Sequence, residues 1–153
     1  MTAEKLREAG VETAAVVATP VDRARRYFRY RPPRCLVGAD PDLNTHRAFR
    51  VPRTEMTDEV LQVDGAKLGG LAKEVGVEAP PGGGMAALNR ADGIDDAEYL
   101  PDMQRHQLQF IAQFLLDRDG VVRWANVECE QDGLEGLGRF PTDDELLTTA
   151  RAL

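Results

Sequence analysis

The sequence has no serine and few of the other residues that most often carry chemistry, with two cysteines and two histidines among its 153 residues. The missing serine excludes a serine hydrolase. Cys35 and Cys129 are far apart and form no CxxC pair, so we expect two free thiols in a reducing cytosol. His46 and His106 have no third ligand at motif spacing, so we expect no metal centre.

Long apolar runs and an excess of positive charge are also missing. No run approaches the roughly 20 apolar residues that cross a membrane, and the polar start "MTAEKLREAG" lacks a signal peptide's apolar segment. The net charge of −7 disfavours binding to nucleic acids or anionic membranes. The basic stretch "RARRYFRYRPPR" is interpreted as a solvated helix face and a loop. We therefore expect a cytoplasmic protein that binds neither nucleic acid nor membrane.

The residues that are present predict a helix and then a strand at the start of the chain. A helix over 2–9 is expected to be capped by Thr2 and stopped by Gly10. The following stretch, "VETAAVVAT", is rich in Ala and Val and ends in a turn signal. Such a run is typical of a strand that is buried on both faces.

The next elements are predicted from their start signals. Thr19-Pro20 is typical of a helix start and leads into "VDRARRYFRY". "RCLVGAD" predicts a short strand, and Asp40 is expected to cap a helix that begins at Pro41. His46 would then lie one turn after Asp42 on the same face of that helix.

From Pro52 to about His106, glycine and proline interrupt the pattern. "TDEVLQVDGAKLGGLAKEVGVEAP" predicts one or two helical turns, "PPGGGM" a flexible turn, and "DDAEYLPDMQRHQ" another helix. We interpret residues 52–106 as an insertion that packs over a single domain spanning 1–153. Neither glycine group follows a strand at phosphate-loop spacing, so no cofactor is expected.

The last third predicts a hairpin and a helix. In "QFIAQFLLDRDGVVRW", Asp117–Gly120 is a typical hairpin turn between two apolar strands. The chain then closes with a helix whose capping box pairs Thr142 with Glu145. Its buried face is predicted to hold Leu146, Leu147, Ala150 and Leu153. The order of elements indicates an α/β fold with a sheet of mixed direction.

Four stretches, "EKLREAGVETAAVVATPVDRARRYF", "LVGADPDLNTHRAF", "QFLLDRDGVVRW" and "FPTDDELLTTARAL", together resemble the redoxin/peroxiredoxin-like family of the AhpC/TSA type. The resemblance covers nearly all of the chain outside the insertion. It implies a thioredoxin-like mixed sheet flanked by helices. It also implies a thiol-dependent oxidoreductase or peroxidase of the antioxidant type.

The sequence departs from that family where the chemistry resides. Family members carry a cysteine at the start of the helix after the first core strand, and the corresponding helix here, 2–9, follows only Met1. Ile111–Gln113 stand where an arginine or a cis-proline is expected. The resemblance therefore implies a domain that is incomplete or inactive as this chain alone.

The missing strand is central in thioredoxin-like sheets, between the strands that correspond to 11–19 and 110–116. Its absence would leave two apolar strand edges unpaired, which folded proteins avoid. We expect the two strands to pair directly, or the gap to be filled by a strand exchanged in a homodimer or by a separately encoded partner.

Each cysteine allows two interpretations. Cys35 follows Arg34, whose guanidinium would favour a catalytic thiolate, yet it also begins an apolar strand where a cysteine is commonly a small buried hydrophobe. Cys129 lies between Glu128 and Glu130, which would raise its pKa, so it is a resolving, partner-linking or structural thiol rather than a nucleophile. A disulfide between the two cysteines is also conceivable.

Three functional hypotheses follow. The first is a redoxin-related domain with vestigial activity, or activity completed by another segment. The second is a non-catalytic binding or scaffold module that uses the 52–106 insertion as a contact surface. The third is a small-molecule enzyme that uses residues of the insertion such as Tyr99, Arg105 or His106.

Overall fold

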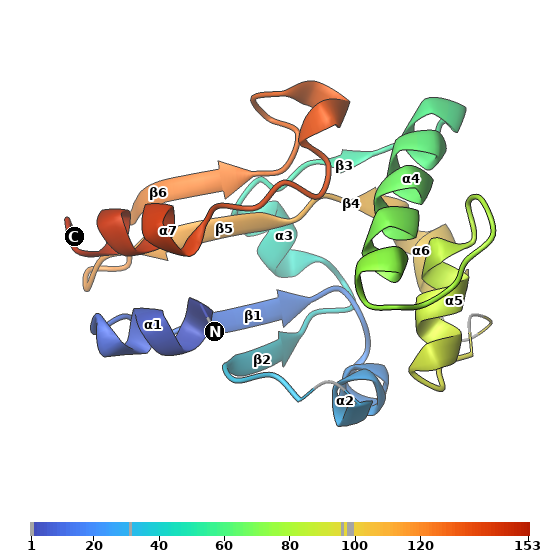
Figure 1. Ribbon diagram of the computed structural model, residues 1–153. Helices are drawn as coiled ribbons and strands as arrows, with labels where there is room; N and C mark the ends of the chain where they lie inside the picture. Colours follow the sequence, from blue (N-terminus) through green and yellow to red (C-terminus); the bar gives the residue numbers. More distant parts are fainter. Residues whose placement is uncertain (1, 31, 96, 98–99) are drawn as a thin grey trace. The chain divides into compact units, whose positions relative to one another are not determined.

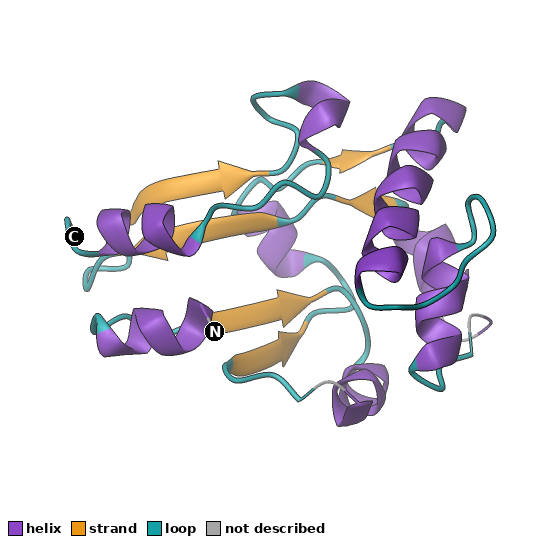
Figure 2. Cartoon of the chain, in the orientation of Figure 1, coloured by secondary structure: helices purple, strands orange, loops and turns teal. Residues whose placement is uncertain are grey.

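Small two-stranded sheets and short helices make up the computed structural model, which describes residues 2–30, 32–95, 97 and 100–153 (Figure 1). Its class is mixed α/β, as expected (Figure 2). The chain separates into two units. The first holds Met1–Val51, Ala112–Val127 and Phe140–Leu153, and the second holds Pro52–Ile111 and Glu128–Arg139.

The first unit contains α1 (Thr2–Glu8), β1 (Ala14–Val17), α2 (Val21–Tyr30), β2 (Leu36–Ala39), α3 (Asn44–Ala48), β5 (Ala112–Leu116), β6 (Val122–Val127) and α7 (Asp143–Ala150). β1 and β2 pair in parallel, with Ala14 opposite Leu36, and α2 connects them. The predicted start of α2 is confirmed, because the Ala24 amide donates to the carbonyl of Pro20. This is the β–α–β unit that the sequence predicted.

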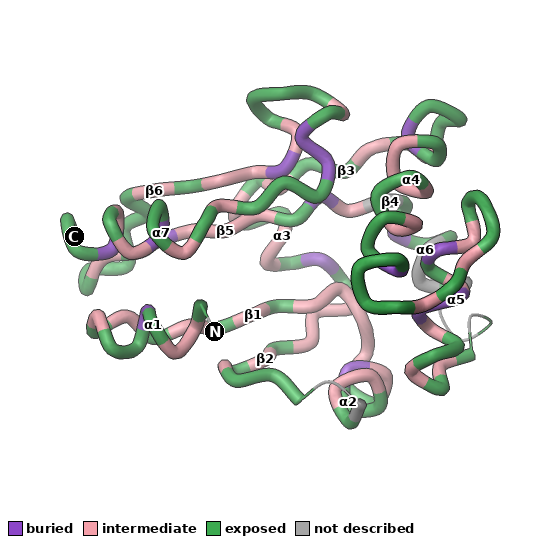
Figure 3. Tube along the Cα trace, viewed as in Figure 1, coloured by how far each residue is buried: buried purple, intermediate pink, exposed green. Residues whose placement is uncertain are grey.

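β1 is shorter and less buried than the sequence predicted. Its residues alternate between exposed and half-buried, and so do those of β2 (Figure 3). Val16 is 41% exposed and Leu36 is 76% exposed. The prediction of a strand buried on both faces is therefore wrong, because neither face of β1 is covered enough to bury any of its residues.

A small apolar cluster holds the first unit together. Leu6 of α1, Leu115 of β5, and Leu146 and Ala150 of α7 are buried against one another, with Trp124 beside them. Helix α1 ends as predicted at Gly10, whose φ of 83° lets the Val11 amide reach the carbonyl of Leu6. Thr2 is not a cap. It lies inside α1, and its hydroxyl bonds the carboxylate of Asp143 at 2.5 Å.

Helix α3 begins later than predicted. Leu43 precedes it in the left-handed region with φ 58°, so the helix starts at Asn44 instead of Pro41. Asp40 still satisfies the first turn, because its carboxylate accepts the amide of Thr45 at 2.6 Å. That hydrogen bond, together with hydrogen bonds from Asn44, lowers the pKa of Asp40 to about 2.

The hairpin and the last helix are as predicted. β5 and β6 are antiparallel, and Gly120 takes φ 78° in the turn. The capping box of α7 is complete, since the hydroxyl of Thr142 accepts the amide of Glu145 and the Glu145 carboxylate accepts the amide of Thr142. Leu146 and Ala150 are buried and Leu147 packs against them. Leu153 is 48% exposed, so its predicted burial is wrong.

The second unit begins at Pro52, like the predicted insertion, but it runs on to Ile111 and includes Glu128–Arg139. It contains β3 (Arg53–Thr54), α4 (Asp58–Glu74), α5 (Gly84–Ala91), α6 (Leu100–His106), β4 (Leu108–Gln109) and the 3-10 turn η2 (Gly133–Gly136). β3 and β4, which the sequence did not predict, are antiparallel. None of the helices in the described residues has the length and apolarity of a membrane-spanning segment.

Helix α4 has 17 residues, so the prediction of one or two turns is wrong. Thr57 caps it by accepting the amide of Val60 at 3.3 Å. Helix α5 packs against α4 at Gly84, where an added Cβ would lie 2.5 Å from the carbonyl carbon of Leu68. Gly84, at the start of α5, therefore permits the close approach of the two helix backbones.

Strands β1 and β5 do not pair with each other. The ladders among the described residues are β1–β2, β3–β4 and β5–β6. Each strand of the first unit is therefore bonded along one edge only, and direct closure of the predicted gap is not observed.

Substituting glycines of α4 and α5 tests this packing. Gly84→Ala should lower the free energy of unfolding by about 1–3 kcal/mol, because the new methyl group clashes with the α4 backbone. Gly70→Ala in α4, where a Cβ meets nothing within 4 Å, should raise it by about 0.5–1 kcal/mol. Urea unfolding followed by far-UV circular dichroism measures both. Equal effects of the two variants would contradict the close approach.

Candidate functional site

A cleft of about 300 Å³ opens beside Cys35 in the first unit. Helix α1 contributes Arg7, the segment before β1 contributes Glu12 and Thr13, and the segment before β2 contributes Arg34 and Cys35. Cys35 is half-buried and lies just before β2. The cleft thus collects a thiol, two guanidinium groups, a carboxylate and a hydroxyl from three segments of the chain.

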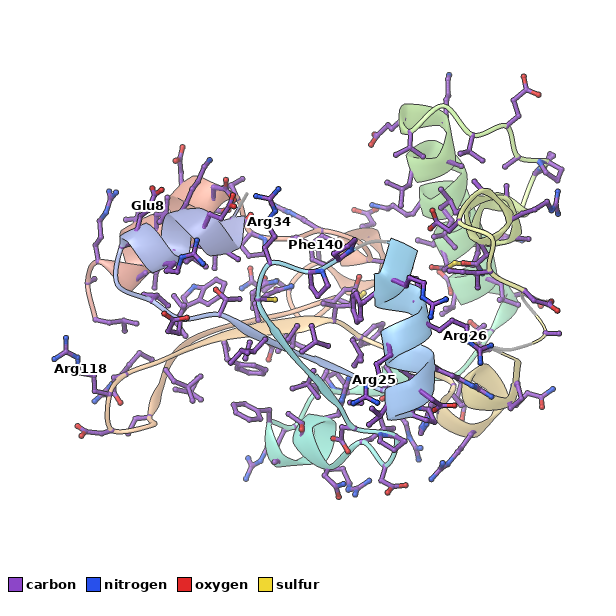
Figure 4. All side chains as sticks on the ribbon, turned by 90° about the horizontal axis from the view of Figure 1, so that it is seen from below. Glu8, Arg25, Arg26, Arg34, Arg118 and Phe140 are labelled. Carbon is purple, nitrogen blue, oxygen red and sulfur yellow. The ribbon has the colours of Figure 1, made fainter. Side chains whose placement is uncertain are left out.

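The guanidinium next to Cys35 is already engaged. Arg34 makes a short ion pair with Glu4 of α1, and Figure 4 shows Arg34 beside that helix. The hydrogen bond from Arg34 lowers the pKa of Glu4. Arg34 was predicted to be an activating charge beside the thiol, but its ion-pair partner is the carboxylate of Glu4.

Thr13 leaves a polar atom unused in the same cleft. Its Oγ1 is buried and has no hydrogen-bond partner among the residues that the structure describes. A buried hydroxyl without a partner costs free energy and is uncommon.

Cys129 lies in the second unit, two residues after the end of β6. Its φ of 64° is left-handed, which is strained for a residue with a side chain. Burial raises the pKa of the thiol, Glu128 raises it further, and Lys67 opposes the shift. The predicted direction is confirmed, although burial is the larger cause. Both cysteines are free, so the conceivable disulfide is not present.

Glu128, predicted only to raise the pKa of Cys129, is a buried carboxylate with a structural role. It is 6% exposed, and its two oxygens accept the amides of Ile111, at 2.9 Å, and Gly138. Its own amide donates to the carbonyl of Ile111 at 2.9 Å. Glu128 therefore joins the end of the β4 segment to the loop after η2. Burial and this negative charge raise the pKa of Asp64 in α4.

A larger cleft, of about 770 Å³, lies in the second unit at the end of α4. Gly69, Lys73, Val77 and Glu78 are among its lining residues. No residue pattern predicted this cleft, because it depends on how the chain turns back after α4.

The histidines do not form a site in the described residues. His46 lies on α3, but Asp42 precedes that helix, so the predicted one-turn spacing is wrong. His106 is buried at the end of α6, and its Nε2 has no hydrogen-bond partner among the described residues. No group of three or more His, Cys, Asp or Glu side chains gathers there as metal ligands. Tyr99, named for the small-molecule hypothesis, lies outside the described residues.

Comparisons with protein-family models, with curated proteins and with solved structures found no match for this chain.

A pair of carboxylate variants tests the role of Glu128. Glu128→Gln replaces one acceptor with a donor and leaves one backbone amide without a partner, so the free energy of unfolding should fall by about 1–3 kcal/mol. The exposed neighbour Glu130 is the matched control, and Glu130→Gln should change stability by less than about 0.5 kcal/mol. Hydrogen exchange of the Ile111 and Gly138 amides should accelerate in Glu128→Gln alone.

The reactivity of Cys129 tests its raised pKa. In a Cys35→Ala background, alkylation of Cys129 by iodoacetamide should have a pH midpoint above that of free cysteine, because a raised pKa leaves less thiolate at a given pH. Lys67→Gln removes the charge that lowers this pKa and should move the midpoint higher. Lys73→Gln, at the far end of α4, is the control. A midpoint below that of free cysteine would contradict the assignment.

Proposed function

We propose that this chain is a redoxin-related domain with a thioredoxin-like arrangement that is incomplete on its own and that lacks a peroxidatic centre. The proposal combines the resemblance in sequence with the order of elements in the first unit. Parallel β1–α2–β2, antiparallel β5–β6 and a final α7 packed on the same apolar cluster follow the order that such a domain would have.

The single observation that carries this proposal is the pairing of strands. β1 and β5 each lack a partner on one edge among the described residues. That pattern is what a thioredoxin-like sheet would leave if its central strand were supplied from elsewhere. The two strands that would flank it, β1 and β5, are present, and each pairs on its other edge, β1 with β2 and β5 with β6.

Any thiol chemistry would depend on Cys35, because its cleft is open whereas burial raises the pKa of Cys129. A Cys35 thiolate that attacks a peroxide breaks the O–O bond, forms a sulfenic acid and releases water or an alcohol. With a disulfide, it forms a mixed disulfide and releases one thiolate. Fast reaction needs a positive charge near the sulfur, and Arg34 pairs with Glu4 instead.

Peroxide kinetics test whether the chain alone is inactive. The native protein should consume hydrogen peroxide no more than about tenfold faster than free cysteine, because the guanidinium next to Cys35 in the sequence is paired with Glu4. Cys35→Ala and Cys129→Ala should each change that rate little. Mass spectrometry of the sulfenic acid trapped with dimedone measures which thiol has reacted. A rate several orders of magnitude faster that is lost in Cys35→Ala would establish a working peroxidatic cysteine and overturn the proposal.

A second candidate is a binding module without chemistry. It is favoured by the cleft of about 770 Å³ at the end of α4 and by the exposed apolar side chains of Leu71, Val75 and Met85 on α4, its end and α5. Slow labelling of both thiols until the protein is denatured would favour this candidate. Labelling of native Cys35 at about the rate of free cysteine would favour the first, because the cleft beside this thiol is open.

A further inference from the structure

The hydrogen bonds of β1 fix which of its backbone groups remain open. The carbonyl of Val17 accepts the amide of Asp40 at 2.9 Å, so the backbone groups of Val17 point towards β2. Because successive residues of a strand point to opposite edges, Ala15 shares that direction. The amides and carbonyls of Ala14 and Val16 therefore point to the other edge, which has no ladder in the described part of the chain.

The same argument applies to β5. Ile111 bonds Glu128 and Asp117 bonds Val121, so the odd-numbered residues of this segment point towards β6. The break in register falls between Leu115 and Leu116 opposite Arg123, so the extra residue is in β6 and the alternation along β5 is preserved. Ala112, Phe114 and Leu116 therefore point their backbone groups to an edge without a ladder in the described residues.

The outer edges of the two sheets carry features that prevent further pairing. Pro32 and Pro33 precede β2. β6 carries Arg123 and the bulge. Prolines, charges and bulges are the means by which proteins block exposed strand edges.

The open edges of β1 and β5 have none of these features. β1 reads AAVV and β5 reads AQFLL, without charge, proline or glycine. Parallel strands such as β1 are normally buried in the interior of a sheet. In Figure 1, β2 and β5 lie on opposite sides of β1. The two edges without blocking features are therefore the edges of β1 and β5 that face each other. An isolated domain would be expected to block these edges as well, because they have no partner strand.

We propose that the open edge of β1 binds an extended apolar strand of another polypeptide, and that the open edge of β5 bonds the other side of that strand. This is an interaction surface of the β-augmentation type, in which the backbone supplies affinity and alternate side chains supply specificity. The inference does not depend on a redoxin function.

A second copy of this chain fits the edge less well. The two edges are four and five residues long. Edge pairing of that length spans about 15 Å and covers far less than the roughly 1,200 Å² of a stable dimer. The net charge of −7 also makes two copies repel. An inserted strand instead gains bonds on both of its edges.

The surroundings define the chemistry of the bound strand. On one face of the β1–β2 pair, Ala14, Val16 and Leu36 are exposed next to Gly38, so this face is apolar. A strand beside them should carry Val, Ile or Leu at alternate positions on that face. Charged side chains of both signs are exposed near these edges, since Arg7 precedes Glu12 and Arg118 precedes Asp119, so the apolar face is what defines the bound strand.

Hydrogen exchange with a synthetic probe tests the proposal. The probe is a peptide of alternating valine and threonine with lysine at both ends, and the control peptide has proline at every second position. The valine–threonine peptide should bind the full chain and slow exchange at Ala14, Val16, Ala112, Phe114 and Leu116 by about tenfold or more. Exchange at Ala15 and Val17, which are already bonded to β2, should change little.

Two variants at positions of matched exposure separate binding of the peptide at the open edge from nonspecific binding to apolar surface. Val16→Lys places a charge on β1 and should abolish binding of the peptide. Val122→Lys is the control on β6, because Val122 is 42% exposed and Val16 is 41% exposed. Ala14→Pro removes an amide that faces the open edge while the bonds of Ala15 and Val17 remain, and it should also abolish binding.

Sedimentation of the chain alone should give a monomer whose Ala14 and Val16 amides exchange rapidly. A dimer with these amides protected would overturn the proposal in favour of a second copy. A monomer in which they are already protected would overturn it in favour of direct closure between β1 and β5. Failure of the valine–threonine peptide to bind a chain with exposed edges would overturn it outright. The inference shares the open edges of β1 and β5 with the proposed function. Fast peroxide reactivity of Cys35 would overturn the proposed function and leave this inference standing, so the two failures are distinguishable.

Discussion

Backbone hydrogen bonding at β1 is the constraint on which the rest of the first unit depends. The side chains of a strand of Ala and Val make no hydrogen bonds with water. Its stability must therefore come from backbone hydrogen bonds to strands on both edges and from burial of its two faces. Here one ladder is present, and all four residues are exposed or half-buried. The first unit is also stabilised by a buried apolar cluster of α1, β5 and α7. The cluster consists of Leu6, Leu115, Leu146 and Ala150.

The two thiols occupy environments with different chemistry. Cys35 opens into a polar cleft, but the nearest guanidinium in sequence is bound to Glu4. Cys129 is confined by a left-handed backbone, and η2 approaches it so closely that a Cβ on Gly136 would lie 3.4 Å from its Cα. These features fit a structural thiol at Cys129 and leave Cys35 as the thiol that a partner could still recruit.

The second unit is organised around one buried acid and one helix pair. Glu128 bonds two backbone amides from segments that are distant in sequence, which is the arrangement that makes a buried carboxylate tolerable. Helix α4 reaches 17 residues despite Gly65, Gly69 and Gly70, because packing against α5 outweighs their low helix propensity. The cap at Thr57, followed by Asp58 and Glu59, was a readable start signal for this helix.

By itself, the sequence determined the features that arise from neighbouring residues. The stop at Gly10, the start after Pro20, the turn at Gly120 and the capping box of Thr142 all follow from bonds spanning a few residues. Tertiary structure alone decided the exposure of β1, the length of α4, the burial of Glu128 and the engagement of Arg34 with Glu4. Those properties depend on partners brought together from distant segments, and local residue patterns carry no information about which distant groups will meet.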